Sequence, residues 1–168
     1  MFKLSTSFPS NTNLCQGDTV QAIVSGAANY IWSPALGLSS SNSDSVGVFP
    51  VTNTNYSILG IDSLGCSSTI LFNVSVNPSP NISVTSSNNT ICLGDAAILT
   101  ANGGVAYSWQ PSSSLNTNTG STVSAIPNNT TIYTVTGIDA NNCFESTNIT
   151  ITVNPLPIIS VNTNTSTI

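Results

Sequence analysis

The residues that could most readily do chemistry in this chain are its four cysteines, Cys15, Cys66, Cys92 and Cys143. A thiol can act as a nucleophile, bind a metal ion or form a disulfide bond. A nucleophile needs an activating base, and zinc sites usually include histidine or a CxxC pair; this sequence has neither. An even number of regularly placed cysteines is more typical of disulfide bonds. We therefore expect all four to be oxidised, with free buried thiols as the alternative.

The cysteines belong to a repeat of the whole sequence. Cys92 and Cys143 follow Cys15 and Cys66 by 77 positions, and the same ungapped spacing relates many other residues. The matched pairs include Gly17 and Gly94, Asp18 and Asp95, Tyr30 and Tyr107, Trp32 and Trp109, Tyr56 and Tyr133, Gly60 and Gly137, Asp62 and Asp139, and Asn77 and Asn154. A fixed period identifies the unit that folds.

The repeat predicts three segments. Residues 1–77 and 78–154 form one module each, and residues 155–168 form a linker and the first strand of a further module, or a strand donated to another chain. Residues 1–8 match the repeat poorly. They are interpreted as a divergent first strand or as an unrelated start.

Within each module the apolar residues alternate with polar ones, which indicates β-strands, and no segment has a helical period. The expected strands are 20–24, 30–32, 46–49, 56–61 and 72–76, and their equivalents 97–101, 107–109, 123–126, 133–138 and 149–153. Long loops rich in Ser, Asn and Gly are expected at 33–45 and 110–122. Short strands at this spacing favour a sandwich. The predicted fold is all-β, with two tandem immunoglobulin-like antiparallel β-sandwiches plus the first strand of a third.

Aromatic residues are the expected core of each sandwich. Tyr30 and Trp32, like Tyr107 and Trp109, are two positions apart and share a strand face. Sugar stacking on the tryptophans is the alternative to core packing, which we favour. Tyr56 and Tyr133 are expected to form tyrosine corners, in which the hydroxyl bonds to nearby backbone. Val135 takes the place of the antibody cysteine, so no central disulfide is expected.

Two disulfide pairings are open. We favour Cys15–Cys66 and Cys92–Cys143, because each module would then be complete in itself; each bond would close a loop of about 50 residues and contribute roughly 3–5 kcal/mol. The alternative assumes a standard sandwich, in which the two cysteines of one module lie at opposite ends of that module. Since bridged Cα atoms lie within about 7 Å, Cys15 would then pair with Cys143, and Cys66 and Cys92 would face other modules.

The charge of the chain excludes several classes of function. One lysine, no arginine and a net charge of −5 do not give the basic surface that binds nucleic acid or anionic lipid. No apolar run is long enough to span a membrane. Without histidine or paired carboxylates no catalytic residue is identified, so we expect no enzyme. Strand edges lacking lysine also favour self-association.

Four aspartates lie at predicted turns: Asp18, Asp62, Asp95 and Asp139. Aspartate side chains commonly cap their own turns, and this is the role we favour. Calcium, which prefers several oxygen ligands, is kept as the alternative at a module junction. Otherwise no metal or other cofactor is expected.

Three segments resemble the immunoglobulin-like or PKD-like repeats of very large Bacteroidetes surface proteins: 91–94 (Ile-Cys-Leu-Gly), 107–111 (Tyr-Ser-Trp-Gln-Pro) and 131–143. The resemblance covers both modules, and its motifs are structural. It implies a type IX secreted adhesin or gliding-motility protein, in which these repeats are a non-catalytic extracellular stalk or filament with neighbouring repeats as partners. Two alternatives remain: a glycan- or protein-binding module that uses the long loops, and a self-assembling fibre joined by strand addition through 155–168.

Overall fold

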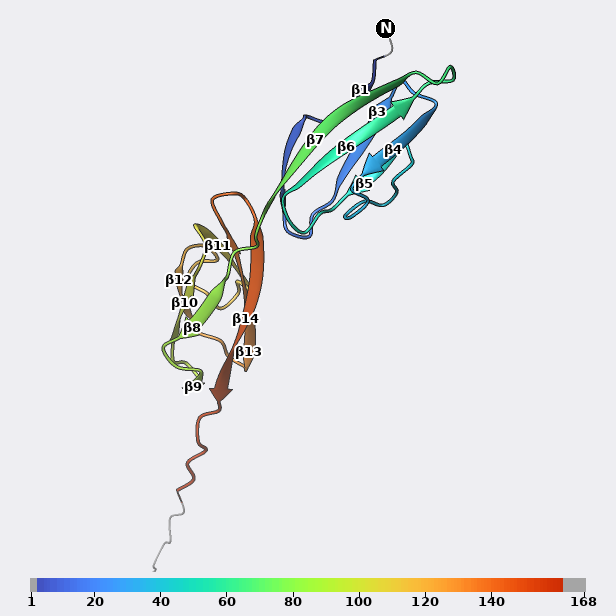
Figure 1. Ribbon diagram of the computed structural model, residues 1–168. Coiled ribbons are helices and arrows are strands. Elements are labelled where there is room, and N and C mark those ends of the chain that lie inside the picture. Colours follow the sequence, from blue (N-terminus) through green and yellow to red (C-terminus); the bar gives the residue numbers. More distant parts are fainter. Residues whose placement is uncertain (1–2, 162–168) are drawn as a thin grey trace, which may run out of the picture. The chain divides into compact units, whose positions relative to one another are not determined.

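The computed structural model describes residues 3–161, and these residues form only strands, turns and loops (Figure 1). The chain divides into two compact units. The first contains the residues up to Ser79 together with Asn141–Cys143, and the second contains Pro80–Ala140 and the residues from Phe144 onward. Residues 3–161 include no helix that could cross a membrane.

The first unit is built from seven strands in two sheets. They are β1 (Ser5–Thr6), β2 (Asn11–Cys15), β3 (Val20–Ser25), β4 (Asn29–Ser33), β5 (Ser45–Val48), β6 (Thr54–Ile61) and β7 (Ser67–Asn77). One sheet has the order β1-β3-β5 and the other β2-β7-β6-β4.

The second unit repeats this topology. Its strands are β8 (Ser83–Ser86), β9 (Thr90–Cys92), β10 (Ala97–Asn102), β11 (Ala106–Gln110), β12 (Thr122–Ala125), β13 (Thr131–Ile138) and β14 (Phe144–Asn154). The sheets have the orders β12-β10-β8 and β11-β13-β14-β9. The prediction of an all-β chain made of sandwiches is confirmed.

One strand pair in each unit is parallel, which corrects the purely antiparallel arrangement expected. β2 runs parallel to β7, and β9 runs parallel to β14. The cause is that the first strand of each sandwich is split. β1 pairs with β3 in one sheet, and after Pro9, which cannot donate to a ladder, the chain continues as β2 in the other sheet.

The divergent first strand, β1, lies within residues 3–8. Thr6 pairs with Val24, whereas Val84 pairs with Ala101. Val24 and Ala101 are 77 positions apart, but Thr6 and Val84 are 78 apart. The first strand is therefore offset by one residue from the repeat of the other strands. Leu4 lies against Gly60 as Ile82 lies against Gly137. This offset explains why the segment matches the repeat poorly although it supplies core residues.

The core of each unit is the space between its two sheets. In the first unit Phe8 packs on Phe72, with ring centroids 4.3 Å apart, and on Trp32, at 6.3 Å. In the second unit Ile149 replaces Phe72, and the core is mainly aliphatic around Trp109 and Tyr133.

Residues 155–161 form no strand, and all seven are exposed. The predicted strand of a further module is therefore absent from this part of the segment. Its remainder, residues 162–168, lies outside the described residues.

Candidate functional site at the cysteines

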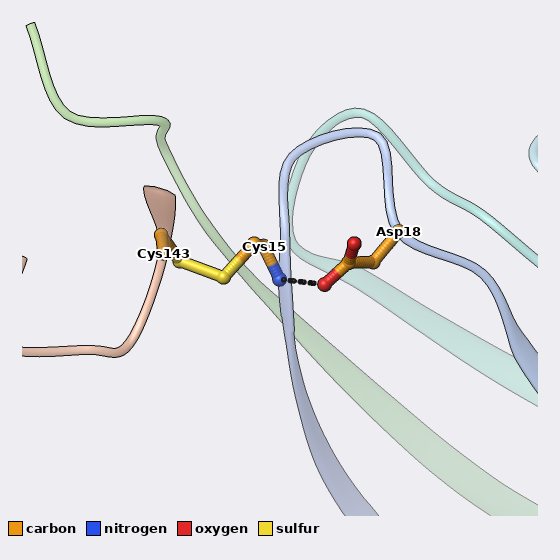
Figure 2. Close-up of a disulfide and its surroundings, with 3 residues drawn as sticks. All are labelled: Cys15, Asp18 and Cys143. Atoms are coloured by element: carbon orange, nitrogen blue, oxygen red, sulfur yellow. Dashed lines mark hydrogen bonds between the residues drawn. A yellow bond between two sulfur atoms is a disulfide. The ribbon is translucent and has the colours of Figure 1, made fainter. Parts of the chain in front are cut away.

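A disulfide bond joins Cys15 to Cys143, with Cα atoms 5.4 Å apart (Figure 2). Cys15 is the last residue of β2 and lies opposite Asn77 at the end of β7. The backbone N–H of Gln16 donates to the Asn77 carbonyl at 2.8 Å, which extends this pairing by one residue. The bond therefore connects the first repeat of the sequence to the second.

A tight turn fixes the position of Cys15. The backbone N–H of Asp18 donates to the Cys15 carbonyl at 3.0 Å. The Asp18 carboxylate accepts from the Cys15 N–H at 3.3 Å (Figure 2). Gly17 has a φ of 92°, in a region that L side chains rarely adopt. Asp18 therefore acts as a turn cap, as its sequence position predicts.

Cys143 lies in the turn between β13 and β14, which closes after the pair Ile138–Phe144. Its side chain is fully buried. Asn142 has a φ of 63°, a conformation that asparagine tolerates better than most residues. In the first unit the equivalent position is Gly65, with a φ of 86°.

The favoured pairing within each module is wrong, and the strand register explains why. Cys15 lies opposite the last residue of β7, whereas Cys66 immediately precedes its first residue, Ser67. β7 has 11 residues, so Cys66 lies roughly 36 Å along the strand from the level of Cys15 at the usual rise. A disulfide needs its Cα atoms within about 7 Å. The same argument, with β9 beside β14, excludes a bond between Cys92 and Cys143.

Cys66 and Cys92 are free thiols, and both are exposed. The expectation that every cysteine of the chain is oxidised is therefore corrected within this single chain. The turn that carries Cys66 is nevertheless well ordered by Asp62, whose Oδ1 accepts from the backbone N–H of Leu64 at 2.9 Å and of Cys66 at 2.8 Å. Among residues 3–161, no three histidine, cysteine, aspartate or glutamate side chains gather in a way that could hold a metal ion.

The tryptophans lie in the cores. Trp32 and Trp109 are 2% and 1% exposed. Each indole N–H donates to a carbonyl of the following long loop, that of Ser43 or Gly120, at 2.9 Å. No ring face is available to a sugar, so the stacking alternative is wrong.

The tyrosine hydroxyls that bond to nearby backbone are those of Tyr30 and Tyr107, and not those of Tyr56 and Tyr133 as expected. Tyr30 is buried and Tyr107 half-buried, and each hydroxyl bonds to the backbone three residues upstream, at Ala27 and Gly104. Tyr56 and Tyr133 are fully buried but form no tyrosine corner. Because these rings face the core, their hydroxyls reach the long loops: Tyr56 donates to the Leu36 carbonyl at 2.7 Å, and Tyr133 bonds to the Ser114 hydroxyl. Burial raises the pKa of Tyr56 above its usual 10.0, and a hydrogen bond with Thr54 acts in the opposite direction.

The long loops at 33–45 and 110–122 are tied to both sheets. In the first unit four backbone bonds hold the loop: Val24 to Asp44, Trp32 to Ser41, Ser39 to Gly47 and Phe49 to Gly37. The four equivalent bonds recur in the second unit: Ala101 to Ser121, Trp109 to Asn118, Asn116 to Ser124 and Ile126 to Ser114. These loops therefore cover the core and are not free segments.

One shallow depression lies beside the loop of the second unit. Its volume is about 390 Å³, and it is lined by Ser108, Trp109, Gln110, Pro111, Ser112, Ser113 and Asn118. The lining has no charged side chain, and its one aromatic residue is buried. It offers small polar groups and the Pro111 ring to a ligand.

Comparisons with known proteins agree with this architecture. The model of the family described as "Ig-like domain CHU_C associated" matches residues 79–155, which are almost the whole second repeat. No curated protein matches the chain. The chain thus contains an immunoglobulin-like repeat.

Solved structures are similar to the chain at low sequence identity. The N-terminal eight Ig domains of Down Syndrome Cell Adhesion Molecule are 12% identical, with 85% of this chain and 23% of that chain covered and a TM-score of 0.54. A C-terminal fragment of intimin, solved with the intimin-binding domain of its receptor, is 15% identical, with 89% and 63% covered and a TM-score of 0.49. Fibronectin(III)-like modules of Clostridium thermocellum CbhA are 7% identical, with 96% and 100% covered and a TM-score of 0.41. The first of these supports the immunoglobulin-like fold, which is confirmed.

Proposed function

We propose that the chain is a non-catalytic structural segment of an extracellular protein, in which tandem immunoglobulin-like modules form part of a stalk or filament. The observation that carries the proposal is the Cys15–Cys143 bond, because it joins consecutive repeats covalently. Disulfide bonds persist mainly outside the reducing cytoplasm, which supports an extracellular location.

The side chains that recur in both repeats also support a structural role. The repeated aromatic residues are used in packing and in holding the loops. The exposed surface of the loops is mostly serine, asparagine and threonine. Such surfaces remain hydrated and give few of the aromatic or arginine anchors that dominate binding energy.

The resemblance to Bacteroidetes surface repeats narrows the proposal. It favours a large adhesin or gliding-motility protein exported by the type IX pathway, whose ligand-binding part lies elsewhere in the polypeptide. Neighbouring repeats are then the direct partners of these modules.

Replacement of the segment tests the proposal. In the producing organism, residues 1–154 are exchanged for two unrelated immunoglobulin-like modules of the same length. We expect the parent protein to remain on the surface and adhesion to be retained, because the segment supplies length and not recognition. Loss of adhesion with normal surface display would contradict this role and would favour the binding-module alternative.

Surface location has a separate test. Intact cells are treated with a mild reductant and then with a maleimide that does not cross membranes. Labelling of Cys66 and Cys92 is expected if the segment is extracellular, because both thiols are exposed. Labelling only after cell lysis would contradict the proposed location.

The depression beside Gln110 favours a second candidate, a module that binds a small polar ligand such as a glycan. A glycan array probed with the purified chain tests it. Binding that is lost in the Gln110→Ala/Asn118→Ala variant, but retained in the equivalent first-unit variant Ser33→Ala/Ser41→Ala, would establish this function.

The exposed segment 155–161 keeps the fibre alternative open, since Ile158, Ile159 and Val161 are each more than four-fifths exposed. Strand addition to another chain would bury them. Electron microscopy of the purified chain with and without residues 155–168 distinguishes this assembly from isolated molecules.

A further inference from the structure

The two free thiols occupy the positions of the two bonded ones. Cys92 is the equivalent of Cys15, and Cys66 is the equivalent of Cys143, each at the repeat distance of 77 residues. The bond that is present therefore uses one cysteine from each repeat. The equivalent cysteine of the other repeat, Cys92 for Cys15 and Cys66 for Cys143, is not bonded.

The backbone around Cys92 reproduces that around Cys15. Cys92 lies opposite Asn154 in the parallel β9–β14 pair, as Cys15 lies opposite Asn77. Its carbonyl accepts from the backbone N–H of Asp95 at 3.0 Å, the same length as the bond from Asp18 to Cys15. Gly94 and Gly17 have φ values of 97° and 92°. The backbone thus presents Cys92 in the conformation that forms a disulfide at Cys15.

The turn of Cys66 likewise reproduces that of Cys143. The β6–β7 ladder closes at Ile61–Ser67 and the β13–β14 ladder at Ile138–Phe144, so each turn has five residues and ends in cysteine. The positive φ occurs at the same place in both turns, at Gly65 and at Asn142. Cys66 differs in being exposed, whereas Cys143 is fully buried.

The existing bond also has a direction. It joins the cysteine that ends the second strand of an earlier repeat to the turn cysteine of the next repeat. Cys92 is of the first kind, so a later repeat would supply its partner. Cys66 is of the second kind, so an earlier repeat would supply its partner. Cys66 and Cys92 cannot bond to each other in this way, because their order in the sequence is reversed.

We propose that Cys92 and Cys66 form further disulfides of the Cys15–Cys143 kind with neighbouring modules of the same type, so that each module is bonded to the next. For separate copies of this chain the partner is a second copy, with Cys92 of one copy bonded to Cys66 of another. Such a contact is head-to-tail, and it generates a chain of copies that is open unless the rotation between copies closes it into a ring.

The chemistry is thiol–disulfide exchange with a small-molecule disulfide as oxidant. The Cys92 thiolate attacks the small disulfide, which forms a mixed disulfide and releases one small thiolate. The thiolate of Cys66 from the second copy then attacks the Cys92 sulfur and releases the other small thiolate. Two protein S–H groups lose two protons and two electrons, and one small disulfide is reduced to two thiols.

The experiment uses the full chain in a glutathione redox buffer. Cys66→Ser and Cys92→Ser variants each keep one free thiol; one variant is isotopically labelled, and the two are mixed in equal amounts. Random pairing would give as much heterodimer as both homodimers together. We expect the Cys92–Cys66 heterodimer to exceed the homodimers clearly, and the unsubstituted chain to give a ladder of covalent oligomers on a non-reducing gel, with Cys15–Cys143 unchanged in peptide maps.

A matched control moves the thiol within the same turn. Cys66→Ser/Cys92→Ser/Ser63→Cys carries its one free cysteine at an exposed position three residues away, and its mixture with Cys66→Ser is expected to pair only at random. Random pairing in the main mixture, or equal pairing in the control, would overturn the proposal, as would persistent monomer.

A further arm identifies the source of the partner in native material. Peptide maps of the secreted protein show Cys92 bonded within one longer polypeptide if repeats continue along it, or to Cys66 of another chain if copies associate. Native Cys92 present as a free thiol would overturn the proposal. The inference rests on the proposed function in requiring neighbouring modules, but its chemical readout is separate from the adhesion assay, so either can fail alone.

Discussion

At the scale of single residues, each module places one tryptophan and two tyrosines so that all their polar atoms are hydrogen-bonded. Trp109 is the largest side chain that is fully buried in the second unit. Its indole N–H holds the Gly120 carbonyl and its backbone N–H holds the Asn118 carbonyl, both at 2.9 Å. One residue thus fills the core and also fixes the loop that closes it.

Truncation of Trp109 should be among the most destabilising changes in the second unit. Trp109→Ala removes the ring and leaves a cavity, with an expected loss of about 3–5 kcal/mol in the free energy of unfolding. Urea unfolding followed by far-ultraviolet circular dichroism measures it. Val105→Ala, at a side chain that is 71% exposed, is the control and should change stability by less than about 0.5 kcal/mol. Equal losses in the two variants would show that Trp109 is not a core residue.

Tyr56 should make stability depend on alkaline pH. Its pKa is raised by burial, so the folded protein keeps a proton that the unfolded chain releases. The contribution is complete below about pH 10 and is lost as the pH rises through the folded-state pKa. Both proteins are first alkylated to block their free thiols. The free energy of unfolding, plotted against pH, should fall more steeply for the parent than for Tyr56→Phe. At neutral pH the variant should lose about 1 kcal/mol with its bond to Leu36. Parallel pH curves would contradict the assignment.

At the scale of the strands, the split first strand closes one edge of each sandwich and contributes to both sheets. Leu4, just before β1, and Ile82, just before β8, sit over glycines of β6 and β13. A Cβ at Gly60 would clash with Leu4 Cδ2, and one at Gly137 would clash with Ile82 Cδ1. A Cβ at either glycine would therefore require the side chain of Leu4 or Ile82 to move.

A double-mutant cycle tests that contact. Gly60→Ala should destabilise the first unit by about 1–3 kcal/mol through overpacking, and the loss should be smaller in a Leu4→Ala background because space is then available. Gly47→Ala is the control: its nearest neighbour, Ser39 Oγ, would lie 3.4 Å from the new Cβ, and little change is expected. Denaturant unfolding gives all four free energies of the cycle. Additive losses would mean that Leu4 does not pack on Gly60.

The strands themselves could be predicted from sequence, whereas their partners could not. Alternation at Tyr56, Ile58 and Gly60 gives a strand and its buried face, but a period of two carries no information about which strand lies alongside. The parallel register of β2 on β7 is a long-range pairing, and it alone decides that Cys15 is far from Cys66. The cysteines could therefore be found in the sequence, but their bond depended on a register that only the fold supplies. The first strand could not be recognised from the repeat, because residues before Pro9 are offset by one position from it.

At the scale of the whole molecule, each repeat has its own hydrophobic core, and a disulfide bond joins the two repeats. The only disulfide in the described part of the chain spans 128 positions, so it encloses most of both repeats. Each hydrophobic cluster is nevertheless built from residues of a single repeat. The two cores should therefore form without the bond, while the bond limits the freedom of the unfolded chain.

Removal of the bond should lower stability without preventing folding. The Cys15→Ser/Cys143→Ser variant is expected to keep the far-ultraviolet circular dichroism spectrum of the parent, because neither core cluster needs the sulfur atoms. Its urea midpoint should fall, because the free energy of unfolding should decrease by up to about 5 kcal/mol for a loop of this length. Cys66→Ser/Cys92→Ser, which removes the exposed thiols and leaves the bond, is the matched control and should unfold at the parent midpoint. Reduction of the control protein should reproduce the loss seen in the first variant. If reduction leaves the midpoint unchanged, the bond does not constrain the unfolded chain, and its role is confined to linking one repeat to the next.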